Sequence, residues 1–273
     1  MVLGVKLITK EELIRDFKNI ESQGWIENTS RKTNDGAAGN KLEDLLGIPE
    51  NNLPIPNAAE WELKTHRNTT SSLVTLFHTE PSPRAAGIVP KFLLPNYGWP
   101  HKEAGNKYPE TERSFRATLD AISYTRGFTV YYNKEERKIC IKFNASKVLE
   151  KDYDWLDSVK MRVGNLNDLS VVPYWNIDEI YAKTKMKLLN CFFVYFEVKK
   201  ENERTYFHYF KALMLKDFSI DKFINELEKG HIKIDFDART GHNHGTKCRI
   251  EEKYIPSLYE SSSEVLNEPL LNI

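Results

Sequence analysis

Apolar residues recur at helical spacing in several stretches of the chain, and residues typical of helix ends bound these stretches. The first begins at Thr9, and Glu12 completes a capping box, in which each side chain bonds to the backbone of the other residue. A later pattern starts between Gly36 and Gly39 and stops at Gly47, a residue type that commonly ends helices. The patterns predict helices over about residues 9–24, 36–47, 176–189 and 219–230.

Shorter runs of alternating or continuously apolar residues predict strands between these helices. The strands lie at about residues 60–66, 72–77, 128–132, 138–143, 191–199, 206–215 and 232–239. We expect the first two to be neighbours in a mixed sheet. Residues 79–100 are rich in proline and glycine, and we expect a long irregular connection there. The mixture of helices and strands favours an α/β (α+β) fold over a helical bundle or a sandwich.

The composition of the 273 residues is typical of a globular protein, with 40% hydrophobic and 12% aromatic residues. Basic and acidic residues balance at 39 each, so net charge neither favours nor excludes nucleic acid as a partner. Three widely spaced cysteines form no Cys-x-x-Cys pair, and no apolar run is long enough to span a bilayer. The N-terminal residues lack a signal-peptide pattern, so we expect a cytoplasmic protein that binds no membrane.

A candidate catalytic pair lies in the segment EWELKTH. Because side chains alternate across a strand, Glu62 and Lys64 fall on one face, together with His66. A carboxylate oxygen suits a hard cation such as Mg²⁺, and a nearby ammonium can orient or activate the attacking water of a nuclease. Taken alone, Glu-x-Lys is a weak signal. The same spacing recurs at residues 197–199 and 251–253, and a solvated strand face would also show it.

A second polar segment, residues 231–250, combines groups that can read base edges. Strict alternation buries its isoleucines and Phe236 and places charged residues on the opposite face, before a glycine-flanked loop at residues 242–246. Arginine can bridge two acceptors of guanine, and aspartate can accept from cytosine. Two other interpretations remain open: a metal site with the loop histidines, for which no third ligand stands at a familiar spacing, and a polar strand whose charges pair with one another. The candidate DNA contacts are Asp237, Arg239, His242, Asn243, His244, Lys247 and Arg249.

Two clusters of motifs, far apart in the chain, carry a family resemblance. The upstream cluster comprises Gly24-Trp25-Ile26, then Gly36-x-x-Gly39-x-x-Leu42-Glu43-x-x-Leu46-Gly47, then Pro56-Asn57-x4-Glu62-Leu63-Lys64-Thr65. The C-terminal cluster is His242-Asn243-His244-Gly245-Thr246-x-x-Arg249-Ile250. Together they resemble the MvaI/BcnI family of type II restriction endonucleases, from about residue 10 to Tyr259 and most weakly between about 100 and 175. Both clusters together are specific, and either one alone would be only suggestive.

The resemblance implies a MutH-like PD-(D/E)xK nuclease core, in which helices flank a mixed sheet and two lobes form a DNA cleft. We expect residues 1–165 to form the catalytic lobe and residues 166–273 the DNA-recognition lobe. Studied members of the family are Mg²⁺-dependent monomers that cut double-stranded DNA at short, GC-rich, nearly palindromic sites of the CC-N-GG type. For this chain the resemblance therefore implies a prokaryotic cytosol and a cognate DNA methyltransferase in the same restriction–modification system.

Carried over residue by residue, the resemblance assigns roles within the upstream cluster. Glu62 matches the metal-binding carboxylate, Lys64 the catalytic lysine, and Glu43 the carboxylate of the upstream helix. His66 and Arg67, which follow on the same strand, join the C-terminal residues as candidate DNA contacts. The predicted site therefore combines a short catalytic strand with a distant recognition segment.

One departure from the family pattern concerns the residue after Pro56. The family has an aspartate there, five residues before the glutamate, whereas this chain has Asn57. An amide oxygen is a neutral and weaker ligand for Mg²⁺, so with Asn57 and Glu62 as the metal ligands we predict poor catalysis and retained DNA binding. Asp→Asn is also the usual change for trapping an uncleaved complex. We therefore hypothesise an engineered inactive variant, and its rival is a natural substitution that Glu60 compensates.

Three alternative functions stay open from the sequence. A strand-nicking repair endonuclease like MutH shares the helix glutamate and the Glu-Leu-Lys element, and a partner-dependent nick in one strand would favour it. A modification-dependent nuclease of the same fold would cut methylated DNA but not plain DNA. A DNA-binding module that has lost catalysis would bind a specific site without cutting it, even after Asn57→Asp.

Overall fold

The computed structural model describes residues 8–29, 36–48, 60–68 and 73–267. This part of the chain folds into two compact units, and each is assembled from separate stretches of sequence. The first unit comprises residues 1–72, 182–219 and 256–273, and the second comprises residues 73–181 and 220–255. These boundaries differ from the expected division at residue 165. The assignment of catalysis and recognition to separate lobes stays a prediction.

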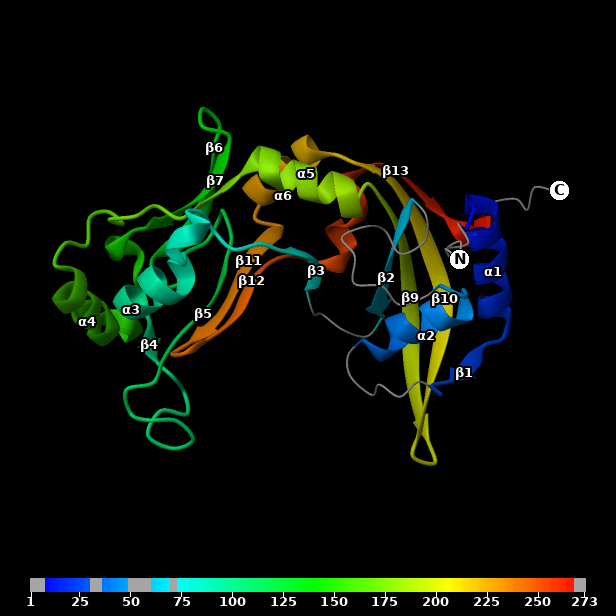
Figure 1. Ribbon diagram of the computed structural model, residues 1–273, viewed down its shortest axis with the longest axis horizontal. Coiled ribbons are helices and arrows are strands. Elements are labelled where there is room, and N and C mark those ends of the chain that lie inside the picture. Colours follow the sequence, from blue (N-terminus) through cyan, green and yellow to red (C-terminus); the bar gives the residue numbers. More distant parts are fainter. Residues whose placement is uncertain (1–7, 30–35, 49–59, 69–72, 268–273) are drawn as a thin grey trace, which may run out of the picture. The chain divides into compact units, whose positions relative to one another are not determined.

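The first unit is built on a mixed sheet with strand order β1-β10-β9-β2, in which β13 also pairs with β10 (Figure 1). Its strands are β1 (Trp25–Glu27), β2 (Trp61–Arg67), β9 (Asn190–Glu201), β10 (Arg204–Phe218) and β13 (Tyr259–Glu264). Neighbouring strands run antiparallel, except that β2 runs parallel to β9. Helices α1 (Lys10–Ser22) and α2 (Ala37–Leu45) belong to this unit, together with the last residues of α5 (Ile177–Lys187).

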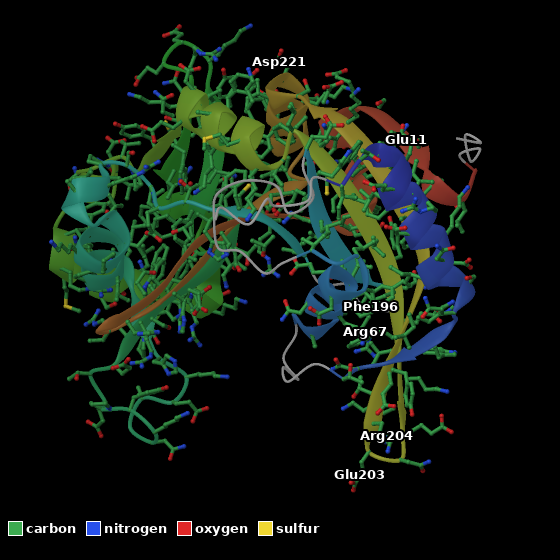
Figure 2. The ribbon with its side chains drawn as sticks, turned by 45° about the vertical axis from the view of Figure 1, so that its right-hand side comes forward. Glu11, Arg67, Phe196, Glu203, Arg204 and Asp221 are labelled. Atoms are coloured by element: carbon green, nitrogen blue, oxygen red, sulfur yellow. The ribbon has the colours of Figure 1, made fainter. Side chains whose placement is uncertain are left out.

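The predicted N-terminal helix and the strands predicted at residues 191–199 and 206–215 are confirmed. In α1 the capping box is complete, because Glu12 N–H donates to Thr9 Oγ1 at 3.1 Å and Thr9 N–H donates to Glu12 Oε2 at 2.9 Å. Strands β9 and β10 extend beyond the predicted ranges and meet at Asn202 and Glu203, whose φ angles of 49° and 65° suit a tight hairpin turn. Figure 2 shows Glu203 at the hairpin tip.

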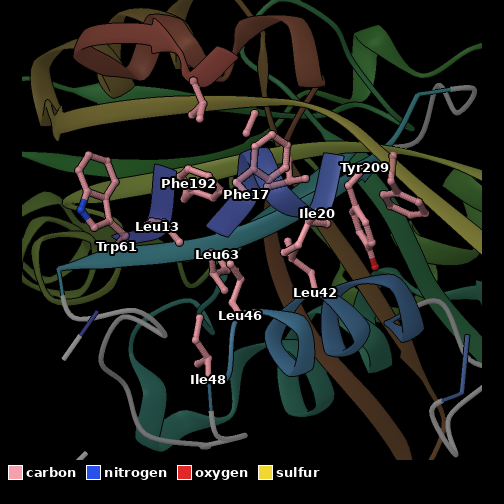
Figure 3. Close-up of a cluster of buried hydrophobic side chains, with 14 of the residues drawn as sticks. Leu13, Phe17, Ile20, Leu42, Leu46, Ile48, Trp61, Leu63, Phe192 and Tyr209 are labelled. Carbon is pink, nitrogen blue, oxygen red and sulfur yellow. The ribbon is translucent and has the colours of Figure 1, made fainter. Parts of the chain in front are cut away.

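The core of the first unit lies where α1 and α2 pack against the sheet. Figure 3 shows Phe17 of α1, Leu42 of α2 and Phe192 of β9 in one apolar cluster, in which all three side chains are fully buried. Tyr209 of β10 joins them, and its hydroxyl donates to the Ala38 carbonyl of α2 at 2.6 Å. Burial raises the pKa of Tyr209, so the hydroxyl stays a hydrogen-bond donor. The cluster fixes α2 against the strand that carries the candidate catalytic pair.

The second unit contains an antiparallel sheet of order β3-β12-β11-β5-β4 and a smaller sheet of order β6-β7-β8. Its strands are β3 (Val74–His78), β4 (Trp99–Pro100), β5 (Arg113–Leu119), β6 (Phe128–Asn133), β7 (Lys138–Phe143), β8 (Tyr174–Asn176), β11 (Ile232–Arg239) and β12 (His242–Ile250). Its helices are α3 (Leu94–Tyr97), α4 (Tyr153–Val163), α6 (Ile220–Glu228) and the first part of α5, up to Tyr181. Single 3₁₀ turns occur in both units, at Arg84–Ala86, Ala145–Lys147, Glu150–Asp152, Glu252–Tyr254, Pro256–Leu258 and Val265–Asn267.

Two expectations about the segment after β2 are wrong. Strand β3 does not neighbour β2 but pairs with β12, in the sheet of the second unit. Apolar periodicity indicates a buried strand and leaves its partner undetermined, which explains the error. The proline-rich segment is not irregular throughout, because a π-helical turn at Val89–Leu93 leads directly into α3. Pro90 lies at the second position of the π-helical turn, where its missing N–H group leaves no helical bond unmade.

Two further observations concern the lengths of the helices and the state of the cysteines. Within the described residues, no helix is both long and apolar enough to cross a membrane. The three cysteines are free thiols, and all of them are buried.

Candidate active site

Strand β2 presents two chemically different faces. Trp61 and Leu63 belong to the apolar cluster, whereas Glu62 and Lys64 point to the opposite side of the strand. This confirms the alternation predicted from the sequence. Because Leu63 is packed against α1 and α2, the strand is held in a register that keeps the Glu62 and Lys64 side chains together.

Glu62 is a buried carboxylate with unequal surroundings at its two oxygens. Only 3% of the residue is exposed. Oε1 accepts a hydrogen bond from Lys64 Nζ at 3.3 Å and lies 3.5 Å from Lys187 Nζ. Oε2 is buried and has no hydrogen-bond partner among the described residues. A buried polar oxygen without a partner is energetically unfavourable, which indicates that another group completes its environment.

The unpartnered oxygen of Glu62 suits a hard divalent cation. Mg²⁺ keeps several waters in proteins and is commonly held by one or two carboxylates, so the unpartnered Oε2 is a suitable ligand. The described residues contain no cluster of three or more His, Cys, Asp or Glu residues placed to hold a metal. The second predicted ligand, Asn57, lies outside the described residues, as does Pro56. Its contribution to a metal site stays a prediction.

Helix α2 lies against the apolar face of β2. A Cβ atom added at Gly39 would meet Thr65 Oγ1 at 3.4 Å, so the helix and the strand are in close contact there. Leu42 enters the same cluster as Leu63. Glu43 follows Leu42 and is half-buried, on a helix that packs on the side of β2 opposite to the Glu62 carboxylate. Its role as a site residue stays a prediction.

His66 and Arg67 differ in their exposure. His66 is 7% exposed, and its ring stacks on Phe193 with ring centroids 6.1 Å apart and planes 23° apart. Arg67 is exposed at the end of β2, beside its β9 partner Phe196 (Figure 2). The burial of His66 shows that it packs within the unit. Contact with DNA stays a prediction for both residues.

A buried thiol lies beside the Glu62 position on the neighbouring strand. Cys191 pairs with Glu62 in the β2–β9 register, and burial raises the pKa of its thiol to about 12. The Cys191 thiol and the Tyr259 hydroxyl share a hydrogen bond, and burial also raises the pKa of Tyr259 well above its ordinary value. Both groups therefore stay neutral near pH 7, and they line the site without adding charge to it.

In the second unit, β11 shows the predicted alternation along its whole length. Ile232, Ile234 and Phe236 are buried, and the charged residues between them are half-buried. On the polar face Asp235 accepts hydrogen bonds from Arg249 Nη1 at 3.0 Å and from Thr118 Oγ1 at 2.9 Å. The charges of this face therefore pair with one another, as one of the open interpretations expected.

Two more ion pairs continue along the same face. Asp237 Oδ1 lies 2.8 Å from Arg116 Nε on β5. Arg239 donates to the buried Glu112 at 3.1 Å, and its guanidinium lies 4.7 Å from the Tyr108 ring centre. These neighbours hold the arginines in defined orientations, which suits recognition of a rigid partner. Sequence periodicity did not identify Arg116 or Glu112, because pairing between β5 and β11 is what brings them to Asp237 and Arg239.

The loop predicted at residues 242–246 is instead the first part of β12. The turn consists of Thr240 and Gly241, and the strand pairing shifts register before Thr246. Gly245 has a φ of 87°, and its N–H donates to Asn243 Oδ1 at 3.0 Å. A polar sequence that contains glycine is typical of a loop. It also occurs in a strand with a bulge, and this strand keeps its pairing with β11.

The residues of this strand are exposed to different degrees. His242, Asn243 and His244 are exposed near the hairpin end, and the two histidine rings lie 4.2 Å apart, nearly perpendicular to each other. Lys247 is half-buried farther along β12. The exposed trio can contact a partner without repacking of the sheet. Contact with DNA stays a prediction for all the residues named on this face.

Comparisons with known proteins identify the family. Among solved structures, the chain is similar to "Restriction endonuclease MvaI-cognate DNA substrate complex", with a TM-score of 0.71, 22% identity and coverage of 94% of this chain and 99% of that chain. It is also similar to "Restriction endonuclease MvaI in the absence of DNA", with a TM-score of 0.53, 22% identity and coverage of 95% and 99%. These likenesses confirm the predicted mixed α+β nuclease fold, and no curated protein matches the chain. Residues 14–259 match the MvaI/BcnI restriction endonuclease family, so the chain belongs to this family.

Proposed function

We propose that this chain is a Mg²⁺-dependent type II restriction endonuclease. It would hydrolyse phosphodiester bonds of double-stranded DNA, as a monomer, at a short GC-rich pseudo-palindromic site of the CC-N-GG type. Family membership supports the nuclease activity. The observation that carries the proposal is the buried Glu62, whose Oε1 is held by Lys64 and whose Oε2 has no partner among the described residues. A cognate methyltransferase would protect the host site.

The roles of the catalytic residues follow from their positions on β2. Glu62 Oε2 would hold the metal, with residue 57 as the second ligand. When bound, Mg²⁺ would polarise the scissile phosphate and stabilise the leaving 3′ oxygen. Lys64 keeps its ammonium next to Glu62, with 19% of its side chain exposed, so it can hold the attacking water at the edge of the site. A monomer with one such site would cut the two strands in succession.

The polar face of β11 and β12 is the proposed recognition element. Two strands fit into the major groove, where all four base pairs present different donors and acceptors. Arg239 and Arg249 are held by Glu112 and Asp235, and this arrangement favours contacts with guanine. The remaining proposed contacts are Asp237, His242, Asn243, His244 and Lys247, with His66 and Arg67 on the first unit.

Plasmid cleavage with Mg²⁺ tests the proposal, with this chain and its Asn57→Asp form compared side by side. We expect discrete fragments from the Asn57→Asp form, and their sequenced ends would give the recognition site. The matched control adds Lys64→Ala to that form and should abolish cleavage. If Asn57→Asp does not increase cleavage, the hypothesis of an engineered inactive variant fails.

Asn57 favours one other function, a DNA-binding module without catalysis. An amide in place of a carboxylate removes one negative charge from the predicted metal site, while the recognition face is unaffected. Electrophoretic mobility shifts with the mapped family-type site distinguish the two functions. Specific binding without cleavage, in both this chain and the Asn57→Asp form, would decide for the binding module.

A further inference from the structure

We infer that Lys187 is a second catalytic cation, which contacts the scissile phosphate beside Glu62. The inference rests on the proposed function, because it adds a residue to the same site. Lys187 belongs to none of the sequence motifs, and it lies on a segment remote from β2 in the sequence. Its Nζ lies 3.5 Å from Glu62 Oε1, almost as close as that of Lys64.

The backbone around Lys187 is fixed by buried neighbours on the C-terminal side. Lys187 is the last residue of α5, and the following Leu188 is 1% exposed. Asn190 is the first residue of β9 and pairs with Trp61 of β2. Its Oδ1 accepts a hydrogen bond from Asp217 N–H at 3.1 Å. This short connection from helix to strand therefore delivers Lys187 to the Glu62 side of β2. The position is a consequence of the fold rather than of a freely moving surface chain.

The charge around Glu62 favours an anionic partner. Among the described residues, the ion pairs of Glu62 are with Lys64 and Lys187, so this cluster has one more positive than negative charge. An excess of ammonium groups opposes a divalent cation and attracts a phosphate. Since Glu62 Oε2 is suited to the metal, the second lysine is best explained by the substrate's phosphate. DNA would bring the negative charge that the cluster lacks.

The two lysines also differ in exposure, which separates their roles. The Lys187 side chain is 43% exposed, against 19% for Lys64. The more exposed ammonium can leave Glu62 by a small movement and bind a non-bridging phosphate oxygen. There it would stabilise the negative charge that develops as the water attacks. Lys187 neither gains nor loses a proton in this step, and Lys64 remains the partner of Glu62 and of the water.

The test compares Lys187→Met and Lys187→Arg in this chain and in its Asn57→Asp form. The control is Lys216→Met, which removes the same charge from an exposed position on β10. Single-turnover cleavage should fall about 100- to 1,000-fold with Lys187→Met, and Lys187→Arg should restore part of it. In binding experiments without metal, the plot of log affinity for DNA against log salt concentration should become less steep by about 0.9 with Lys187→Met. Calorimetric affinity for Mg²⁺ should stay equal or become tighter, because a competing cation is removed.

Several results would overturn the inference. Cleavage and salt slope equal to those of the parent would show that Lys187 makes no phosphate contact. A weaker Mg²⁺ affinity with an unchanged salt slope would show that it only positions Glu62. If no form cuts DNA but all forms bind it, an unchanged salt slope with Lys187→Met would by itself overturn the phosphate contact. If no form binds DNA at all, the proposed function fails, and the inference fails with it. If Lys187→Met cleaves DNA as rapidly as its parent, only the inference about Lys187 is wrong.

Discussion

A buried carboxylate near the start of β11 allows a quantitative prediction about the stability of the second unit. Glu226 lies in α6, and its side chain is 4% exposed. It accepts a hydrogen bond from Lys229 Nζ at 2.8 Å and lies 2.5 Å from His231 Nδ1, whose ring stacks on Tyr254 with centroids 3.5 Å apart. These contacts join α6 to the segment that leads into β11. We therefore expect Glu226→Gln to weaken the attachment of β11 to α6.

The magnitude follows from the contacts that the substitution removes. Burial raises the pKa of Glu226, but the hydrogen bonds from His231 and Lys229 outweigh it, and the pKa is lowered from the ordinary value of 4.5. Hydrogen bonds to a charged group contribute about 1.5–3 kcal/mol. The side chains of Lys229 and His231 are 50% and 26% exposed, so water replaces part of the loss. We expect Glu226→Gln to lower the free energy of unfolding by roughly 2 kcal/mol near pH 7.

The pH dependence has a definite sign. A carboxyl group whose pKa is lower in the folded state contributes stability above its unfolded pKa, and this contribution is lost as pH falls through the folded pKa. The difference between parent and Glu226→Gln should therefore shrink as pH falls below about 4.5, the ordinary pKa, and through the lowered folded pKa of Glu226. Glu228→Gln, at an exposed position of the same helix, is the matched control and should change stability little.

Hydrogen exchange of the β11 amides, measured between pH 3 and pH 7 with corrections for intrinsic rates, reports this unit separately from the other. Urea unfolding followed by circular dichroism gives an independent value. Equal protection in parent and Glu226→Gln at pH 7 would refute the argument. A difference that persists unchanged at pH 3 would also refute it, because the carboxylate would then not be its source.

Three shorter predictions concern the core, the packing of α2 and recognition. Phe192→Ala removes a fully buried ring that meets Phe17 edge-on at 5.6 Å, and should cost about 3–5 kcal/mol in urea unfolding; a cost under about 1 kcal/mol would contradict the core assignment. Gly39→Ala should stabilise α2 by about 0.5–1 kcal/mol, since the new Cβ meets Thr65 Oγ1 at an acceptable 3.4 Å; a lower melting temperature would contradict this. Arg239→Ala should weaken binding to the mapped site by about 1–3 kcal/mol while binding to a scrambled duplex changes little, and equal losses on both duplexes would exclude base readout.

Local patterns in the sequence predicted the elements of this fold better than their partners. The capping box of α1 and the alternation of β11 depend on neighbours within a few residues, so they are visible in the sequence. Strand β3 was assigned to the wrong sheet because pairing between distant strands depends on which faces the whole chain can bury. The sequence at the start of β12 predicts a loop for a related reason. Pairing with β11 keeps its glycine-containing sequence in a strand.

The same distinction explains which parts of the active site the sequence could reveal. Glu62 and Lys64 are two residues apart, and strand alternation alone places them on one face. Lys187 comes to Glu62 only because β9 pairs parallel to β2 with Asn190 opposite Trp61, and a parallel pair requires a long connection through other elements. No spacing rule could therefore have selected Lys187 among the many lysines of the chain. The proposed contact of Lys187 with the scissile phosphate therefore follows from the fold and not from the motif.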